Sequence, residues 1–127
     1  MSTIGADDLA QQWKGLMARH AAVSCALGTA LNHTHGIGVH EFEVLENLAA
    51  AEDGKRRIQE LADAVALSQS ALSRLVARLE REGLVERCIC DLDRRGVYAN
   101  LTDAGRERHA QALPTQREVL ARLLDGE

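Results

Sequence analysis

The sequence predicts a mainly α-helical fold with a small β-hairpin wing, that is, a winged helix–turn–helix with terminal dimerisation helices. The first observation is a pair of short amphipathic segments, Ile58–Val65 and Gln69–Glu82, which have helical periodicity and are joined by a tight turn. The second is a pair of predicted strands, Leu84–Cys90 and Val97–Leu101, joined by the charged, glycine-ended turn Asp91–Gly96. In such a motif the second helix fits the major groove of DNA.

The composition limits the classes of protein to consider. A chain of 127 residues predicts one domain, and it has no apolar run long enough to cross a membrane. The acidic, polar start lacks the basic and apolar regions of a secretory signal. Three cysteines, an odd number, do not suggest a disulfide framework, so we expect a cytoplasmic protein.

Charge is segregated along the chain although the whole sequence carries −4. Residues 54–96 contain nine Lys/Arg and seven Asp/Glu, a net charge of +2, whereas the rest contains six and twelve, a net charge of −6. This division suits a protein that contacts phosphates with one surface, and ordinary scatter of surface charge is the alternative. The aromatic residues are only Trp13, Phe42 and Tyr98, too few for the stacking platforms of single-strand binders.

A long first helix is predicted over Asp7–His35, about 42 Å at 1.5 Å per residue. Apolar or small residues recur near a 3.5-residue spacing: Leu9, Trp13, Leu16, His20, Val23, Leu27 and Leu31. A helix of this length exceeds what a small domain needs to cover its core, so the surplus stripe is expected to contact a second subunit. A single amphipathic helix packed along a monomer is the alternative.

The remaining elements complete one domain. Gly36 and Gly38 punctuate a connection to a helix over Val39–Ala51, and Lys55–Arg57 is expected as a short basic segment. Ser68 is placed to cap the helix that follows it, and Gly83 to end that helix. Thr102 is expected to cap a fifth helix and Pro114 to open a separate sixth helix. Residues 36–101 are thus assigned to the predicted DNA-binding region.

The exposed side of the helix at residues 69–82 carries the residue types that DNA recognition requires. Arginine can grip guanine with a bidentate fork, glutamine can pair with adenine, and serine can serve bases or phosphates. The residues predicted to face bases are Gln69, Ser70, Ser73 and Arg74. Ser68 and Arg78 are expected to hold phosphates. The alternative is the polar, solvated face that any surface helix shows.

The turn between the two predicted strands supports the DNA-binding interpretation. Arg94 and Arg95 would stand at the hairpin tip, where an arginine is favoured in the negative potential of a narrow minor groove. Asp93 could hold one of them extended through a charge-assisted hydrogen bond, and Gly96 ends the turn. A solvated turn with incidental charges is the alternative.

At these residues the chain resembles the MarR family of bacterial transcriptional regulators. The matching segments are GLVER at Gly83–Arg87, DRRG at Asp93–Gly96, LTDAG at Leu101–Gly105, LSQSALSRLVARLE at Leu67–Glu80 and GIGVHEFEVLENL at Gly36–Leu48. The resemblance implies a homodimer on a pseudo-palindromic duplex, released by a small-molecule ligand or an oxidant. It also implies dimerisation through the terminal helices at residues 7–35 and 102–124, with Arg94 and Arg95 as wing arginines. Gly38 departs from the family, which usually has a helix-capping Thr there, so the second helix is expected to begin loosely.

Cysteine and histidine positions suggest how the protein could be regulated. Cys88 and Cys90 alternate along a strand, so both would point to one face, either as an oxidation switch or as two small strand residues. Cys25 is expected to be buried in the first helix. By analogy with the family's ligand sites, the candidates for an effector pocket are Trp13, His20 and His40.

Other site chemistry has little support in the sequence. His33, His35 and His40 lie close together without a cysteine or carboxylate at a recognisable spacing, so no metal is expected. No nucleophile–base set or phosphate loop is recognised, so neither a cofactor nor enzyme activity is expected. Two alternatives stay open: a thiol-based sensor with the same fold, and a winged-helix module whose wing docks another protein.

Overall fold

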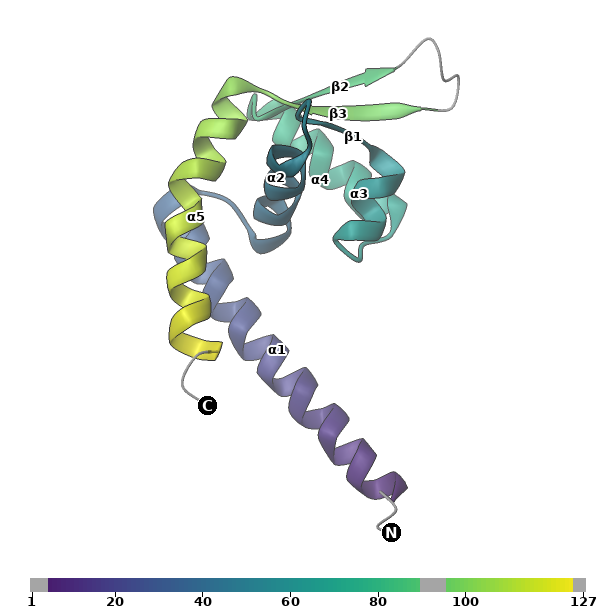
Figure 1. The fold of residues 1–127 in the computed structure, drawn as a ribbon, viewed down its shortest axis with the longest axis vertical. Helices are drawn as coiled ribbons and strands as arrows, with labels where there is room; N and C mark the ends of the chain where they lie inside the picture. Colours follow the sequence, from purple (N-terminus) through teal and green to yellow (C-terminus); the bar gives the residue numbers. More distant parts are fainter. Residues whose placement is uncertain (1–4, 90–95, 125–127) are drawn as a thin grey trace.

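The computed structural model describes residues 5–89 and 96–124. Its elements, in chain order, are α1 (Ala6–His35), α2 (Val39–Ala50), β1 (Lys55–Arg57), α3 (Ile58–Ala64), α4 (Gln69–Arg81), β2 (Val85–Ile89), β3 (Val97–Leu101) and α5 (Asp103–Leu124). Figure 1 shows α2, α3 and α4 gathered beneath a small sheet, with α5 alongside the C-terminal part of α1. The predicted fold class, helical with a β-hairpin wing, is confirmed.

Three antiparallel strands form the sheet in the order β1-β3-β2. Arg57 and Cys88 lie on either side of Tyr98, because Arg57 pairs with Tyr98 from β1 and Cys88 pairs with it from β2. The prediction of Lys55–Arg57 as a mere basic segment was therefore wrong. Three charged residues show no alternation of apolar and polar side chains, and the strand exists because its backbone pairs with β3.

The hydrophobic core lies where the helices meet one face of the sheet. Its fully buried large side chains are Phe42, Leu31, Ile37, Leu45, Leu48, Leu61, Leu72, Leu79, Leu84, Val44, Val76 and Val85. Every helix predicted for the DNA-binding region contributes to this set or packs on it. The core therefore fixes α4 against the sheet and leaves the opposite side of α4 exposed.

The turn between α3 and α4 is held by local hydrogen bonds. As predicted, Ser68 caps α4, and its Oγ accepts a hydrogen bond from the Ala71 N–H at 3.1 Å. The Leu67 N–H donates to the Ala62 carbonyl at 3.1 Å. Between them Ala66 has φ of 56°, the left-handed region that a residue with a Cβ rarely adopts. The turn is thus tight enough to impose backbone strain.

The end of α4 is anchored to the start of α5. Gly83, at φ 76°, ends α4 as predicted, with the Leu84 N–H donating to the Leu79 carbonyl at 2.9 Å in a Schellman arrangement. Thr102 caps α5, since its Oγ1 accepts from the Gly105 N–H at 3.0 Å and donates to the Gly83 carbonyl at 2.7 Å. One hydroxyl thereby fixes where α5 leaves the sheet and the end of α4.

The C-terminal segment is one helix, so the prediction of two helices divided at Pro114 was wrong. α5 runs through Pro114 without a break. Proline removes the hydrogen bond to the carbonyl of residue 110, but Ala110 and Pro114 are both exposed, so water can satisfy that carbonyl. Packing of α5 against α1 and α2 supports the continuous helix.

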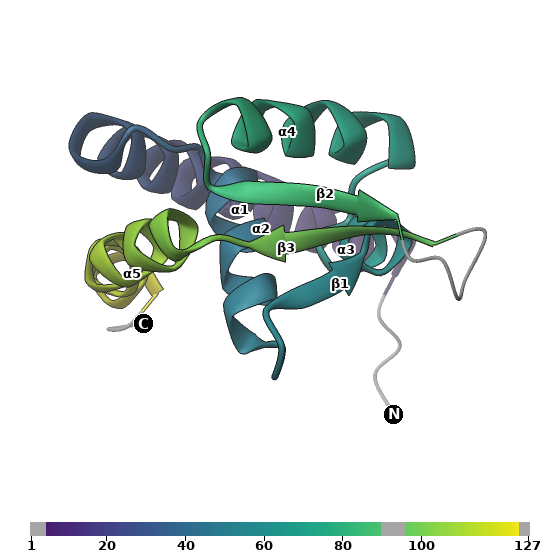
Figure 2. The same cartoon turned by 90° about the horizontal axis from the view of Figure 1, so that it is seen from above.

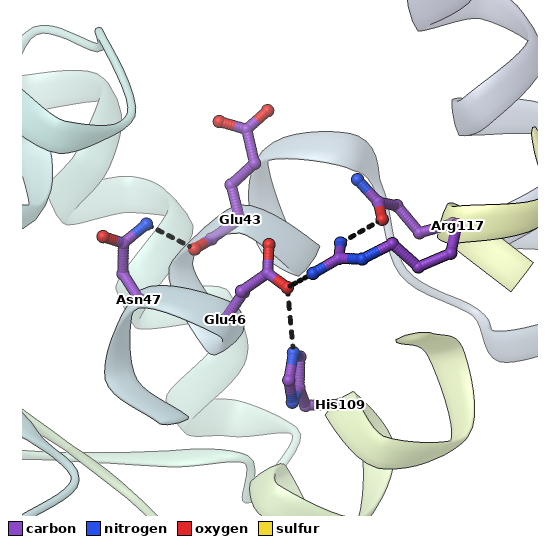
Figure 3. A network of polar contacts seen from close by, with 6 residues as sticks. Glu43, Glu46, Asn47, His109 and Arg117 are labelled. Carbon is purple, nitrogen blue, oxygen red and sulfur yellow. Dashed lines mark hydrogen bonds and ion pairs between the residues drawn. The ribbon is translucent and has the colours of Figure 1, made fainter. Parts of the chain in front are cut away.

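A polar cluster joins α2 to α5 (Figure 3). Glu46 of α2 accepts a hydrogen bond from Arg117 Nη2 at 2.8 Å and lies 3.6 Å from His109 Nε2. The His109 ring also packs on Phe42, with 5.4 Å between ring centroids. α1 is tied to α5 as well, because His35 Nε2 lies 2.8 Å from Thr115 Oγ1. The long helix α5 is therefore connected to both α2 and α1 by specific polar contacts.

The N-terminal half of α1 extends away from the rest of the molecule (Figure 1). Its buried residues are Leu27 and Leu31, both near its C-terminal end. Cys25 is exposed in the single chain, contrary to the expected burial, because it lies two residues before Leu27 and so on the side of α1 away from the buried residues. Among the described residues, no helix combines the length and apolarity needed to cross a bilayer.

Candidate nucleic-acid interface

Helix α4 has two chemically distinct sides. Leu72, Val76 and Leu79 point into the core. On the opposite side the exposed residues predicted to contact DNA are Ser68, Gln69, Ser70, Arg74 and Arg78, with Ser73 partly buried. Figure 2 shows α4 at one side of the molecule, next to β2, with no element covering its outer side. A long partner can therefore approach this helix.

A polar hollow lies between α4 and the base of the wing. Its volume is about 210 Å³, and its lining is Arg57, Ile58, Gln59, Gln69, Ser73, Arg87, Gly96 and Val97. We call it the wing-side hollow. Arg87 Nη2 donates to the Ser73 carbonyl at 3.2 Å, and the Arg87 N–H donates to Glu80 Oε2 at 3.2 Å, so β2 is attached to α4. This hollow combines two arginines, from β1 and β2, with Gln69 and Ser73, which were predicted to face bases.

A second depression lies on the other flank of α4. It has a volume of about 290 Å³ and is lined by His40, Leu67, Ala71, Arg74, Leu75 and Arg78. We call it the His40 groove. Its lining combines the apolar residues Leu67, Ala71 and Leu75 with the cations Arg74 and Arg78. The predicted DNA-contacting residues are thus divided between the two flanks of α4.

A buried carboxylate supports Arg78. Glu41, only 6% exposed, is the buried charged side chain among the described residues. Its Oε1 lies 3.3 Å from Arg78 Nη1 and accepts a hydrogen bond from the Gly38 N–H at 3.2 Å. The start of α2 is therefore held by Glu41 although Gly38 lacks a capping hydroxyl, contrary to the expected loose start. The same carboxylate links α2 to α4.

The wing tip falls outside the described residues. Asp93, Arg94 and Arg95 belong to that segment, and so does Cys90. Gly96 is buried and lines the wing-side hollow. Cys88 is partly buried on β2, with its Sγ 3.5 Å from Asn100 Nδ2.

The three residues predicted for an effector pocket do not lie together. Trp13 and His20 line a hollow of about 660 Å³ along α1 with Leu16 and Met17. His40 lies in the groove against α4. In the single chain, therefore, Trp13 and His20 share one apolar surface and His40 belongs to another.

Sequence reasoning missed several polar residues of this surface. Arg57 and Arg87 line the wing-side hollow, and Tyr98 accepts a hydrogen bond from Arg57 Nε at 3.1 Å. Glu41 was not considered as a partner for Arg78. The basic run at residues 55–57 is visible in the sequence and could have indicated Arg57. The direction of the Arg57 side chain, however, depends on the pairing of β1 with β3, which is not evident in the sequence.

Comparison with known proteins places the chain in a family. Residues 35–96 match the model of the MarR family. The chain is 33% identical over 92 residues to the uncharacterized HTH-type transcriptional regulator YkoM of Bacillus subtilis, a match that covers 72% of this chain and 58% of YkoM.

Solved structures agree with this placement. A MarR family transcriptional regulator from Streptomyces coelicolor, solved in complex with DNA, superposes with a TM-score of 0.86 at 28% identity, over 97% of this chain and 77% of that chain. AbsC, a MarR family transcriptional regulator from the same organism, gives a TM-score of 0.84 at 28% identity, over 97% and 82% of the two chains. The matched winged region, the helical ends and these similarities together show that the chain belongs to the MarR family.

Proposed function

We propose that this chain is a non-enzymatic transcriptional regulator that binds duplex DNA, with α4 in the major groove and the wing in the adjacent minor groove. The observation that carries the proposal is the exposed side of α4, where Gln69, Arg74 and Arg78 stand opposite a buried apolar side. These side chains offer the donors and acceptors that base edges and phosphates require. The similar Streptomyces coelicolor regulator in complex with DNA supports the same role here.

We also propose that the chain acts as a homodimer on a pseudo-palindromic site. The support is an apolar stripe on α1 that the other described residues leave exposed. Its exposed large residues are Leu9 at 52%, Trp13 at 60%, Leu16 at 63% and Met17 at 45%. Leu124 of α5, 44% exposed, lines a neighbouring depression with Leu16 and Val23. Pairing through this surface would present two α4 helices about one turn of DNA apart, roughly 34 Å.

Release of DNA by a small-molecule effector is part of the proposal. A ligand in the His40 groove would occupy space beside Arg74 and Arg78, and so would compete with DNA for both. The apolar surface that Trp13 and His20 share offers a second place, completed by the other subunit. Control by oxidation of Cys88 and Cys90, and docking of a protein on the wing, stay as alternative predictions.

Selection of bound fragments from genomic DNA tests the main proposal and supplies a target duplex. Arg74→Ala is then expected to weaken binding to the selected duplex by about 1–3 kcal/mol and to reduce its preference over a scrambled duplex. Arg106→Ala is the matched control, because Arg106 is an exposed arginine whose guanidinium lies beside Gly54 and lines neither of the two depressions that flank α4. Absence of any enriched fragment, together with no duplex binding at low salt, would refute the proposal.

A further inference from the structure

Helix α2 buries a carboxylate in its first turn. The Glu41 side chain is 8% exposed, and its Oε1 accepts a hydrogen bond from the Gly38 N–H at 3.2 Å. Its Oε2 is buried and has no hydrogen-bond partner among the described residues. A carboxylate oxygen that loses its water and gains no donor is unfavourable. Another interaction of Glu41 must therefore offset the burial of this group.

Capping of α2 does not account for the charge of Glu41. A glutamine at the third helical position bonds back to the preceding N–H as a glutamate does, so it would hold the Gly38 N–H equally well. The helix dipole favours a negative charge in the first turn, but an exposed glutamate would gain this benefit without the unfavourable burial. What the buried carboxylate adds to a glutamine is a charge for a nearby cation.

That cation is Arg78 of α4. Its Nη1 donates to Glu41 Oε1 at 3.3 Å. The Arg78 side chain is 62% exposed, so the guanidinium is held from the buried side and stays open to solvent on the other. Among the described residues only its Nη1 is engaged, although arginine offers five N–H donors in a planar fork. The edge formed by Nε and Nη2 is therefore available to a second acceptor.

The place of Arg78 on α4 indicates which acceptor this is. Arg78 lies in the C-terminal half of α4, beyond the N-terminal residues that contact base edges in this motif. Side chains at such positions contact the sugar–phosphate backbone. A long, exposed side chain loses conformational freedom when it binds DNA, and one that is already held in direction loses less. A fixed guanidinium therefore binds a phosphate more tightly than a mobile one.

We propose that the buried Glu41 carboxylate holds Arg78 in the direction in which its Nε and Nη2 bond to a DNA backbone phosphate. Glu41 is thus a positioning residue, since it contacts Arg78 and not the DNA. Two parallel, charge-assisted N–H···O bonds would join the guanidinium to the phosphate. This inference rests on the proposed DNA binding and adds to it a residue of α2, outside both the recognition helix and the wing.

A double-mutant cycle on DNA affinity isolates this role. We would titrate the wild type, Glu41→Gln, Arg78→Gln and the double variant with the duplex recovered by genomic selection, at several salt concentrations. Arg78→Gln is expected to weaken binding and to reduce the slope of log K against log salt by about 0.9, because one phosphate contact is lost. Glu41→Gln is expected to weaken binding by about two- to tenfold and to keep the slope, because Arg78 remains but is no longer held. In the Arg78→Gln background it is expected to cause no further weakening.

Glu43→Gln is the matched control, because it removes the same charge from α2 two residues later, on a different side of the helix. We expect this variant not to weaken binding. Thermal unfolding checks the fold of each protein. Glu41→Gln keeps the shape of the side chain and the bond to the Gly38 N–H, so it is expected to unfold at or above the wild-type temperature. Even for a destabilised variant the cycle decides, because a loss of structure weakens binding with or without Arg78.

Three results would overturn the inference while leaving the proposed function intact. The first is an unchanged affinity in Glu41→Gln. The second is tighter binding in Glu41→Gln, which would mean that the carboxylate competes with the phosphate for Arg78. The third is an equal weakening with and without Arg78, which would mean that Glu41 acts on the fold alone. Failure of the wild type to bind any duplex would instead refute the proposed function, and this inference with it.

Discussion

The backbone of α5 passes very close to the end of α4 at Gly105. A Cβ at this position would lie 2.0 Å from the Leu84 carbonyl oxygen and 2.7 Å from a methyl of Leu101. Gly105→Ala is therefore expected to destabilise the protein by about 1–3 kcal/mol, because the junction between β2 and α5 would have to separate. Chemical denaturation measures the difference.

Gly15→Ala is the control for that substitution, since nothing lies within 4 Å of a Cβ added at this exposed position of α1. In this helix interior the change is expected to stabilise by about 0.5–1 kcal/mol. If Gly105→Ala were as well tolerated as Gly15→Ala, the close approach would not exist in solution.

Relief of backbone strain at Ala66 is expected to stabilise the protein, whereas Gly105→Ala is expected to destabilise it. Ala66 holds φ of 56° in the turn between α3 and α4, where glycine has no steric penalty. Ala66→Gly is expected to stabilise the protein by roughly 0.5–1 kcal/mol. Ala77→Gly, inside α4, is expected to destabilise by about 1 kcal/mol. Urea unfolding of both variants tests the pair, and destabilisation by Ala66→Gly would contradict the left-handed conformation.

The residues that cap the helix ends could be predicted from the sequence, but contacts between residues far apart in the chain could not. Ser68, Gly83 and Thr102 occupy the positions that their conformational preferences indicate. The contacts of Glu41 with Arg78 and of Arg57 with Tyr98 join residues 37 and 41 positions apart. Such pairs depend on how the elements pack, which local patterns do not encode.

At the scale of elements, the contact of α2 with α5 connects the helices packed beneath the sheet to the long helices. Glu46 meets Arg117 and His109 there (Figure 3). A double-mutant cycle of Glu46→Gln and Arg117→Gln is expected to give a coupling free energy of about 0.2–1 kcal/mol, because both side chains are partly exposed. Thermal unfolding of the four proteins measures it, and no coupling would mean that the ion pair does not persist in solution.

The elements themselves were largely predictable. Periodicity gave the type of every predicted helix and strand, and the boundaries differ by one or two residues at most of their ends. Lys55–Arg57 and Pro114 are the exceptions. A three-residue strand is defined by its partner, and a proline can lie inside a helix where the released carbonyl faces water.

At the scale of the whole molecule, the uncovered stripe on α1 predicts self-association. Leu16→Arg places a charge in the stripe, and it is expected to shift the protein from dimer to monomer in sedimentation velocity. Ala18→Arg adds the same side chain to an exposed position on the other side of α1, so it is expected to leave the dimer intact. Equal mass for both variants and the wild type would show that this stripe is not the interface.

The candidate interface could be predicted only in part. The α4 residues followed from helical periodicity, because a helix buried on one side exposes the other. The depressions on either flank of α4 could not be foreseen, since each combines residues from elements separated in the chain. For the same reason Trp13 and His20 lie on one surface and His40 on another.

We expect two chains, joined through α1, to place two α4 helices on one duplex. Sedimentation of the protein with a labelled duplex recovered by genomic selection measures this directly. We expect a complex of two chains per duplex, which Leu16→Arg reduces to weak binding of single chains and which Ala18→Arg leaves unchanged. A monomer that ignores every duplex at low ionic strength, or a full-affinity complex of one chain per duplex, would contradict it.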